Sequence, residues 1–213
     1  MPSYVGTEAL VGEFPHMAAI GWTHQNGSTS WQCGGSLIWE NFILTAAHCT
    51  ENDDLVPPDV ARLGYLYLPG RGDIKEAGQQ LKIVKVIRHP QHRATSRHYD
   101  LALLMLEKNV QVNTVVIPAC LWPYDEVRFQ KFEAAGWGAT GFYQPSSEKL
   151  LKVTLTAFTN DACSTYYNDK RGKHSNGIRN HQICAGDEKM DLCTVNSAYI
   201  YVVHYSHRIH VSK

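Results

Sequence analysis

Short runs of apolar and β-branched residues, each about the length of one strand, recur through most of the chain and are separated by turn-forming clusters. The clusters combine Gly, Pro, Asn and Asp, as in Gln25-Asn26-Gly27 and Val56-Pro57-Pro58. The runs expected to form strands are 17–22, 35–38, 42–45, 60–68, 81–87, 101–106 and 150–158. Only 160–167 favours a short helix, with Asn160 or Asp161 as its cap. This pattern predicts an all-β barrel or sandwich.

A boundary is expected near the middle of the chain. Pro118 and Pro123 interrupt strand-like segments there. We therefore expect two sub-barrels, at about 1–117 and 118–213.

The charge balance and the hydropathy exclude two classes of partner. The chain has 20 basic and 20 acidic residues, whereas a nucleic-acid binder usually shows a basic excess. No apolar run approaches the roughly 20 residues that span a bilayer. The first residues, Met1-Pro2-Ser3-Tyr4, have neither a basic nor an apolar region, so the chain as written has no secretory signal.

The cysteines favour an oxidising compartment. All six are widely spaced, and no CxxC pair, HExxH motif or other metal-ligand cluster is present, so we expect disulfides and no metal. Six cysteines allow 15 connectivities, and their number alone does not choose among them. Asn26-Gly27-Ser28 is an N-glycosylation sequon, which fits a secreted protein; the alternative is a chance tripeptide.

One histidine is placed to act as a general base. In Leu44-Thr45-Ala46-Ala47-His48-Cys49, a strand of large residues runs into small ones and then into His48. Small residues let a loop pack tightly, and a cysteine can fix it, which holds the imidazole where a base must be held. A purely structural histidine is the alternative, since the chain has 11.

Several ordered motifs resemble one protein family. The segment Cys33-Gly34-Gly35-Ser36-Leu37-Ile38 and the segment ending at His48-Cys49 resemble the chymotrypsin-like (S1) serine proteases. The further matching segments are His98-Tyr99-Asp100-Leu101-Ala102-Leu103-Leu104, Ile117-Pro118-Ala119-Cys120-Leu121, Gly136-Trp137-Gly138-Ala139-Thr140 and Gln182-Ile183-Cys184-Ala185-Gly186. Within the family, the chain is most similar to the arthropod clip-domain proteases of immune and developmental cascades.

The resemblance implies a fold and an activity. The fold would be two antiparallel β-barrels of the trypsin type, the second incomplete. The activity would be that of a secreted serine endopeptidase acting on protein or peptide substrates through an acyl-enzyme, with no cofactor. His48 would be the base, Asp100 would hold its tautomer, and Ser197 stands in the register of the nucleophile, counted from Cys193. Asp191 would select Arg or Lys substrates; a simple loop carboxylate is the alternative.

The resemblance also implies how the cysteines are used. Cys33 would pair with Cys49, and Cys163 with Cys184. Cys120 resembles the cysteine that tethers a protease domain to an upstream clip segment. The partner of Cys193 would lie further downstream than this chain extends.

The chain departs from the family after Thr194. The family has Gly-Asp-Ser-Gly-Gly-Pro, whereas this chain has Val195-Asn196-Ser197-Ala198-Tyr199-Ile200. Val195 replaces the glycine whose N–H builds the oxyanion hole, and a β-branched residue is poorly suited to unusual backbone angles. The family's released N-terminus and its last strands have no counterpart, which favours a gene-model or splice artefact over gradual decay. The sequence thus predicts an inactive chain, either a protease homologue that binds without cleaving or a fragment.

Overall fold

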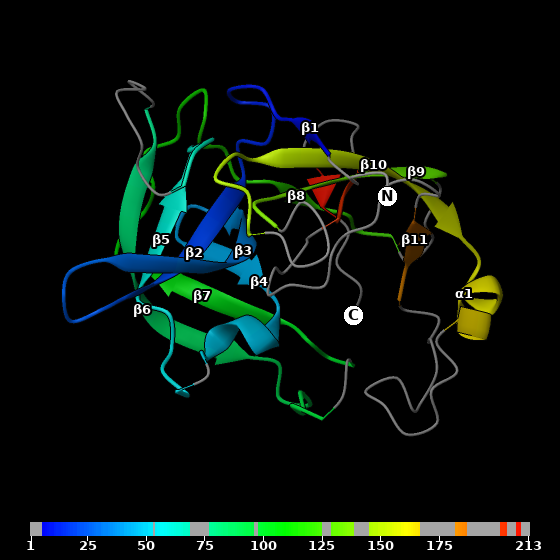
Figure 1. The fold of residues 1–213 in the computed structure, drawn as a ribbon, viewed down its shortest axis with the longest axis horizontal. Coiled ribbons are helices and arrows are strands. Elements are labelled where there is room, and N and C mark those ends of the chain that lie inside the picture. Colours follow the sequence, from blue (N-terminus) through cyan, green and yellow to red (C-terminus); the bar gives the residue numbers. More distant parts are fainter. Residues whose placement is uncertain are drawn as a thin grey trace.

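The computed structural model describes residues 6–52, 54–68, 77–95, 98–124, 129–138, 145–166, 182–186, 201–203 and 208–209, the last two ranges by their backbone. These residues form one closed six-stranded barrel and a second sheet that stays open (Figure 1). Helix is confined to one α-helical and one 3-10 segment among them. Neither helical segment of this described part is long and apolar enough to cross a membrane. The predicted all-β class, with one complete and one incomplete barrel, is therefore confirmed.

Every neighbouring pair of strands in the barrel is antiparallel. Its order is β2-β3-β4-β7-β6-β5. The strands are β2 (Met17–Thr23), β3 (Thr29–Trp39), β4 (Phe42–Thr45), β5 (Val60–Leu63), β6 (Gln79–Arg88) and β7 (Ala102–Leu106). In β7, Ala102, Leu104 and Leu106 are buried while the residues between them are half-buried, because successive side chains of a strand point to opposite faces. The inward-facing residues of all six strands pack into the main hydrophobic core.

One predicted strand is shorter in the structure than in the sequence pattern. The run 60–68 suggested a single strand, but β5 ends at Leu63. Gly64 has a φ of +76°, a left-handed conformation that glycine adopts without steric cost. A Cβ at this position would lie 2.9 Å from a methyl carbon of Val116. The chain therefore turns away from the barrel where the apolar pattern alone predicts that it continues.

The second sheet is built mainly from the second half of the chain. Its order is β1-β10-β9-β12-β13-β8, and β11 pairs with the other end of β10. The strands are β1 (Thr7–Glu8), β8 (Cys120–Leu121), β9 (Lys131–Gly136), β10 (Leu151–Phe158), β11 (Cys184–Gly186), β12 (Tyr201–Val203) and β13 (Arg208–Ile209). Phe132 and Leu155, from β9 and β10, are almost fully buried in a separate core.

Strand β1 ties the N-terminal segment to this second sheet. Thr7 pairs with Lys152 across the β1–β10 ladder, so β1 lies beside β10 (Figure 1). Two ion pairs strengthen the join: Lys149 Nζ lies 2.6 Å from Glu8 Oε1, and Lys152 contacts the carboxylate of Glu13. The second of these is partly shielded from solvent, so it resists screening by salt better than an exposed pair.

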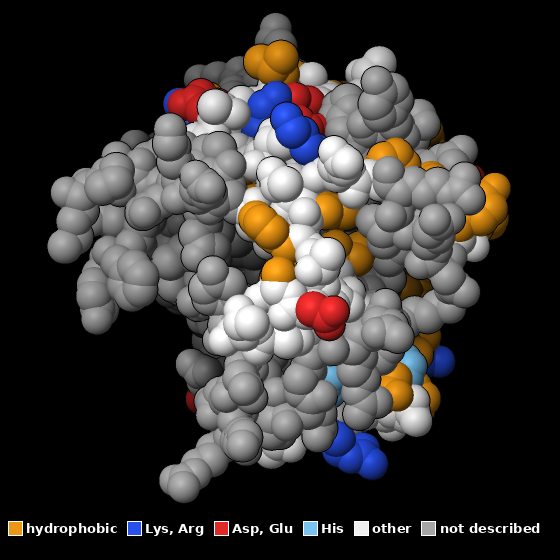
Figure 2. Space-filling view, turned by 90° about the vertical axis from the view of Figure 1, so that its right-hand side faces the viewer, with side chains coloured by type: hydrophobic (Ala, Val, Ile, Leu, Met, Phe, Trp, Pro, Cys, Tyr) orange, Lys and Arg blue, Asp and Glu red, His pale blue; other side chains and the backbone are white. Residues whose placement is uncertain are grey.

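The expected helix forms, with a different cap. Helix α1 (Asn160–Tyr166) covers the predicted segment up to the last residue that the structure describes there. The side chain of Thr159, rather than that of Asn160 or Asp161, accepts the backbone N–H of Ala162 at 3.3 Å. A disulfide between Cys163 and Cys184 joins α1 to β11. On this side of the molecule, described basic and acidic side chains adjoin along one edge and otherwise stand singly (Figure 2).

Candidate active site

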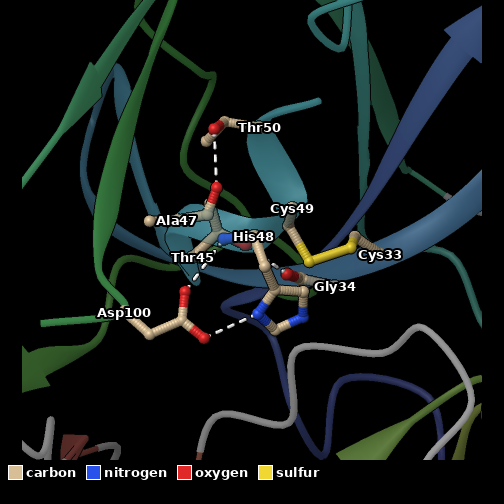
Figure 3. The surroundings of a disulfide bond; sticks show 8 residues. All are labelled: Cys33, Gly34, Thr45, Ala47, His48, Cys49, Thr50 and Asp100. Carbon is tan, nitrogen blue, oxygen red and sulfur yellow. Dashed lines mark hydrogen bonds and ion pairs between the residues drawn. A yellow bond between two sulfur atoms is a disulfide. The ribbon is translucent and has the colours of Figure 1, made fainter. Parts of the chain in front are cut away.

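The segment that carries His48 is held rigidly at the end of β4. It is a single 3-10 turn, η1 (Ala47–Thr50), in which Ala47 and Cys49 are buried and only the His48 side chain faces outward. The Cys33–Cys49 disulfide, with its Cα atoms 5.9 Å apart, fastens the turn to β3 (Figure 3). The hydroxyl of Thr45 donates a hydrogen bond to the carbonyl of Gly34 at 2.8 Å. The turn is thus attached to the neighbouring strand on both sides of the histidine.

A close approach of two strands supports this attachment. A Cβ on Gly35 would lie 2.5 Å from a methyl carbon of Ile43 and 3.0 Å from the carbonyl oxygen of Leu44. Side chains essentially never approach at such distances, so β3 and β4 pack here only because Gly35 has none. The glycine sets the position of β4 and, through it, that of η1.

Asp100 lies at the tip of a tight turn just before β7. Tyr99 has a φ of +57°, which costs a non-glycine residue about 1–2 kcal/mol. The turn closes through a hydrogen bond from the backbone N–H of Leu101 to the carbonyl of Tyr99 at 2.8 Å. The ring of Tyr99 stacks on His89, with ring centroids 4.9 Å apart. The strained backbone aims the carboxylate of the next residue at η1.

The two candidate residues meet through a pair of hydrogen bonds. Nδ1 of His48 lies 2.7 Å from Oδ2 of Asp100, and the backbone N–H of His48 donates to Oδ1 at 2.9 Å (Figure 3). The Asp100 side chain is 16% exposed, and that of His48 is 40% exposed. Burial raises the pKa of Asp100, but the hydrogen bonds and charge of His48 outweigh it, so the pKa lies below the usual value.

This arrangement selects one tautomer of the imidazole. An ionised carboxylate only accepts hydrogen bonds, so Nδ1 must carry the proton that faces Asp100. The lone pair of the neutral ring then stands on Nε2, which points away from Asp100 (Figure 3). No residue within the described ranges is hydrogen-bonded to Nε2. The geometry therefore provides an oriented base that faces away from its supporting carboxylate.

A second histidine, which the sequence analysis missed, lies on the other oxygen of the carboxylate. Nδ1 of His92 is 3.9 Å from Oδ1 of Asp100, and its side chain is 14% exposed. This Nδ1 is buried without a hydrogen-bond partner. The charge of His92 is one of the causes that lower the pKa of Asp100. The sequence held one clue, a segment with histidines at 89, 92 and 98 that leads into Asp100.

The cysteines beside His48 do not form a metal site with it. Cys33, His48 and Cys49 are the one group of three potential metal ligands found in the described part of the chain. The two sulfur atoms are bonded to each other, so neither offers the thiolate that a metal requires. Only the imidazole would remain as a ligand.

The other sequence-predicted site residues fall into three groups. Cys163 and Cys184 are bonded, as the resemblance implies, with their Cα atoms 6.4 Å apart. Cys120 is exposed and makes no disulfide within the described residues. Asp191, Cys193 and Ser197 lie outside the described residues.

Comparison with known proteins gives a consistent result. The Trypsin family model matches residues 4–197. Serine protease snk of Drosophila melanogaster is 39% identical over 185 residues, which cover 85% of this chain and 41% of that protein. Phenoloxidase-activating factor 3 of Holotrichia diomphalia is 35% identical over 207 residues, 90% of this chain and 57% of that protein. CLIP domain-containing serine protease C9 of Anopheles gambiae is 30% identical over 198 residues, 89% of this chain and 51% of that protein. The chain thus spans about half the length of these relatives.

Proposed function

Because the chain belongs to the trypsin family of serine proteases, we propose that it is the protease portion of a secreted serine endopeptidase-type protein that engages protein substrates. One observation carries the proposal: Asp100 binds both the ring and the backbone of His48, at 2.7 and 2.9 Å. A structural histidine needs only a satisfied ring, whereas here the carboxylate fixes the ring, the backbone and the tautomer together.

The proposed chemistry is acyl transfer with two proton movements at Nε2 of His48. As Ser197 Oγ attacks the carbonyl carbon of the substrate, its proton moves to Nε2. The imidazolium then gives this proton to the leaving amine as the C–N bond breaks and the acyl-enzyme forms. Water then hydrolyses the acyl-enzyme through the same two proton movements in reverse, which releases the carboxylic acid product. Asp100 remains ionised and stabilises the imidazolium in both steps.

The family, an acidic residue and the disulfides support a proposed substrate class and location. Asp191 stands where trypsin-like members keep an acid, so we propose cleavage after Arg or Lys. The disulfides at Cys33–Cys49 and Cys163–Cys184 favour an oxidising, extracellular setting. A relative whose name states that it activates phenoloxidase, together with a CLIP domain-containing relative, supports a role in an extracellular activation cascade. Cys120, exposed on β8, would tether an upstream segment.

The residues around Ser197 favour a second candidate function. Val195 and Asn196 replace the family's Gly-Asp before the nucleophile, and Ala198 and Tyr199 replace the two glycines after it. Loss of one oxyanion donor lowers the rate on the order of 10²–10³-fold. We therefore propose that this sequence turns over peptides very slowly, if at all. It would then act as a non-catalytic homologue that binds its target without cleaving it.

The test compares this chain with a version carrying the family nucleophile segment. The matched variant has Val195→Gly, Asn196→Asp, Ala198→Gly, Tyr199→Gly and Ile200→Pro. Both are assayed with a chromogenic arginyl amide and a fluorophosphonate probe, and thermal unfolding establishes that each is folded.

We expect the native sequence to be at least about 10²-fold slower than the matched variant. A rate within tenfold of it would show that Ser197 works in its present setting and would remove the non-catalytic candidate. If the matched variant folds but neither hydrolyses the amide nor reacts with the probe, the residues around Ser197 are not what limits turnover, and the proposed cause of the slow rate is wrong. His48→Ala in the matched variant is the control for hydrolysis by contaminants.

A further inference from the structure

The sequon Asn26-Gly27-Ser28 lies at a position that the proposed peptidase chemistry does not use. It forms the tip of the hairpin between β2, which ends at Thr23, and β3, which begins at Thr29. Two backbone hydrogen bonds close the tip, from Gly27 N–H to His24 O at 2.9 Å and from His24 N–H to Ser28 O at 2.8 Å. Gly27 has a φ of +81°, so the turn suits a glycine. The tip is therefore an ordered structure.

The side chain of Asn26 is held by its oxygen alone. Oδ1 accepts the backbone N–H of Ser28 at 2.9 Å and the hydroxyl of Ser28 at 2.7 Å. The amide nitrogen Nδ2 has no hydrogen-bond partner among the described residues. Two donors on the oxygen draw electron density from the amide and make its N–H protons more acidic. The reactive nitrogen of the sequon is thus both polarised and unoccupied.

Space around the tip is open. All five residues from 24 to 28 are exposed. A Cβ built on Gly27 would meet no atom within 4 Å. A large hydrophilic group attached to Asn26 would extend into solvent without displacing any described side chain, and neither turn-closing hydrogen bond uses Nδ2.

We propose that Asn26 is an N-glycosylation site. The donor is a lipid-linked oligosaccharide with a pyrophosphate leaving group, and an oligosaccharyltransferase supplies the base. Nδ2 attacks the anomeric carbon, the bond from that carbon to the pyrophosphate oxygen breaks, and the oxygen keeps the electron pair. The base removes one proton from Nδ2. The inference rests on the secretory route that the proposed function also requires, and it is independent of any peptidase activity.

The experiment expresses the full chain behind a heterologous secretion leader in insect cells. The wild type is compared with Asn26→Gln, Ser28→Ala and Ser28→Thr, with and without peptide N-glycosidase treatment. Both the medium and the endoplasmic-reticulum fraction are analysed. Because glycans are attached before secretion, the glycosylation of a poorly secreted variant can still be measured in the second fraction. A co-expressed glycoprotein shows that transfer is working in the same cells.

We expect the glycosidase to increase the mobility of the wild type and of Ser28→Thr and to leave Asp in place of Asn26 in the peptide map. Asn26→Gln and Ser28→Ala should show no shift. An unmodified Asn26 in wild-type chain from the endoplasmic reticulum, beside a fully glycosylated reporter, would overturn the proposal. Glycosylation is measured as the mass of the peptide that contains Asn26, independently of peptidase activity. A glycosylated chain without peptidase activity therefore refutes only the proposed cleavage. An active chain without a glycan refutes only the proposed glycosylation site.

Discussion

Replacing Asp100 with Asn tests the reasoning on the tautomer, because the new amide cannot satisfy both donors of His48. In the wild type, one oxygen accepts the backbone N–H and the other accepts Nδ1–H. The amide has one acceptor and one donor group. A backbone nitrogen always carries its proton, so the amide oxygen must remain on it. The NH₂ group then faces Nδ1, which can accept only if the ring proton moves to Nε2.

The expected loss of stability is small and depends on pH. A hydrogen bond to an ionised group is roughly twice as strong as a neutral one, so the change costs about 1–1.5 kcal/mol. For a chain of this size, that lowers the Tm by about 2–6 °C. The pKa of Asp100 is lowered on folding, so the ionised carboxylate stabilises the folded state at pH values above the ordinary pKa of 3.8. This stabilisation is lost as the pH falls through the folded-state pKa. The gap in Tm should therefore close in acid.

The effect on the base should be much larger than the effect on stability. Nitrogen-15 NMR of the ring, at a pH above the ordinary imidazole value of about 6.5, distinguishes the two tautomers directly. We expect protonated Nδ1 in the wild type and protonated Nε2 in Asp100→Asn. In related proteases the corresponding change lowers kcat on the order of 10⁴-fold, and the matched variant with the family nucleophile segment should respond similarly. The same His48 tautomer in both proteins would refute the argument.

Three further changes test the surroundings of this pair. His92→Phe removes the second imidazole, so the pKa of Asp100 should rise and acid unfolding, followed by near-ultraviolet circular dichroism, should begin at a higher pH; an unchanged midpoint would show that 3.9 Å is too far to matter. Replacing Cys33 and Cys49 with Ser opens a loop of 16 residues and should cost about 3 kcal/mol in urea unfolding; a loss below 1 kcal/mol would contradict this. Gly35→Ala places a Cβ 2.5 Å from a side chain of β4 and should cost about 1–3 kcal/mol, whereas equal stability would mean that the strands separate freely.

Several strands of the fold could be predicted from local patterns in the sequence, for identifiable reasons. The run 42–45 coincides with β4, and 101–106 differs from β7 by one residue, because alternating or continuous apolar residues between turn signals report strand burial directly. Strand β9 was not predicted as a strand. Its sequence, Lys-Phe-Glu-Ala-Ala-Gly, has few β-branched or aromatic residues, and it forms a strand because β10 and β12 flank it.

The candidate site could be predicted from the sequence only in part. His48 and Asp100 could be named because each stands in a distinctive motif, but nothing local in the sequence states that one carboxylate binds both ring and backbone. The left-handed φ of Tyr99 could not be predicted either, since tyrosine rarely adopts it and tertiary contacts such as the stack on His89 impose it. His92 was missed because its approach to Asp100 depends on that turn.

The pairing of β1 with β10 constrains the order in which the chain can fold during its synthesis. Strands β2 to β7 are contiguous in sequence, so the barrel can close once β7 has left the ribosome. Thr7, by contrast, can pair with Lys152 only after β10 has been synthesised. Contacts between residues so far apart in the sequence form slowly. Until they form, the N-terminal segment is accessible to proteases. Ribosome-bound chains stalled after β7 should lose this segment to brief digestion, and those stalled well beyond β10 should keep it. Equal protection at both lengths would mean that the segment docks elsewhere first.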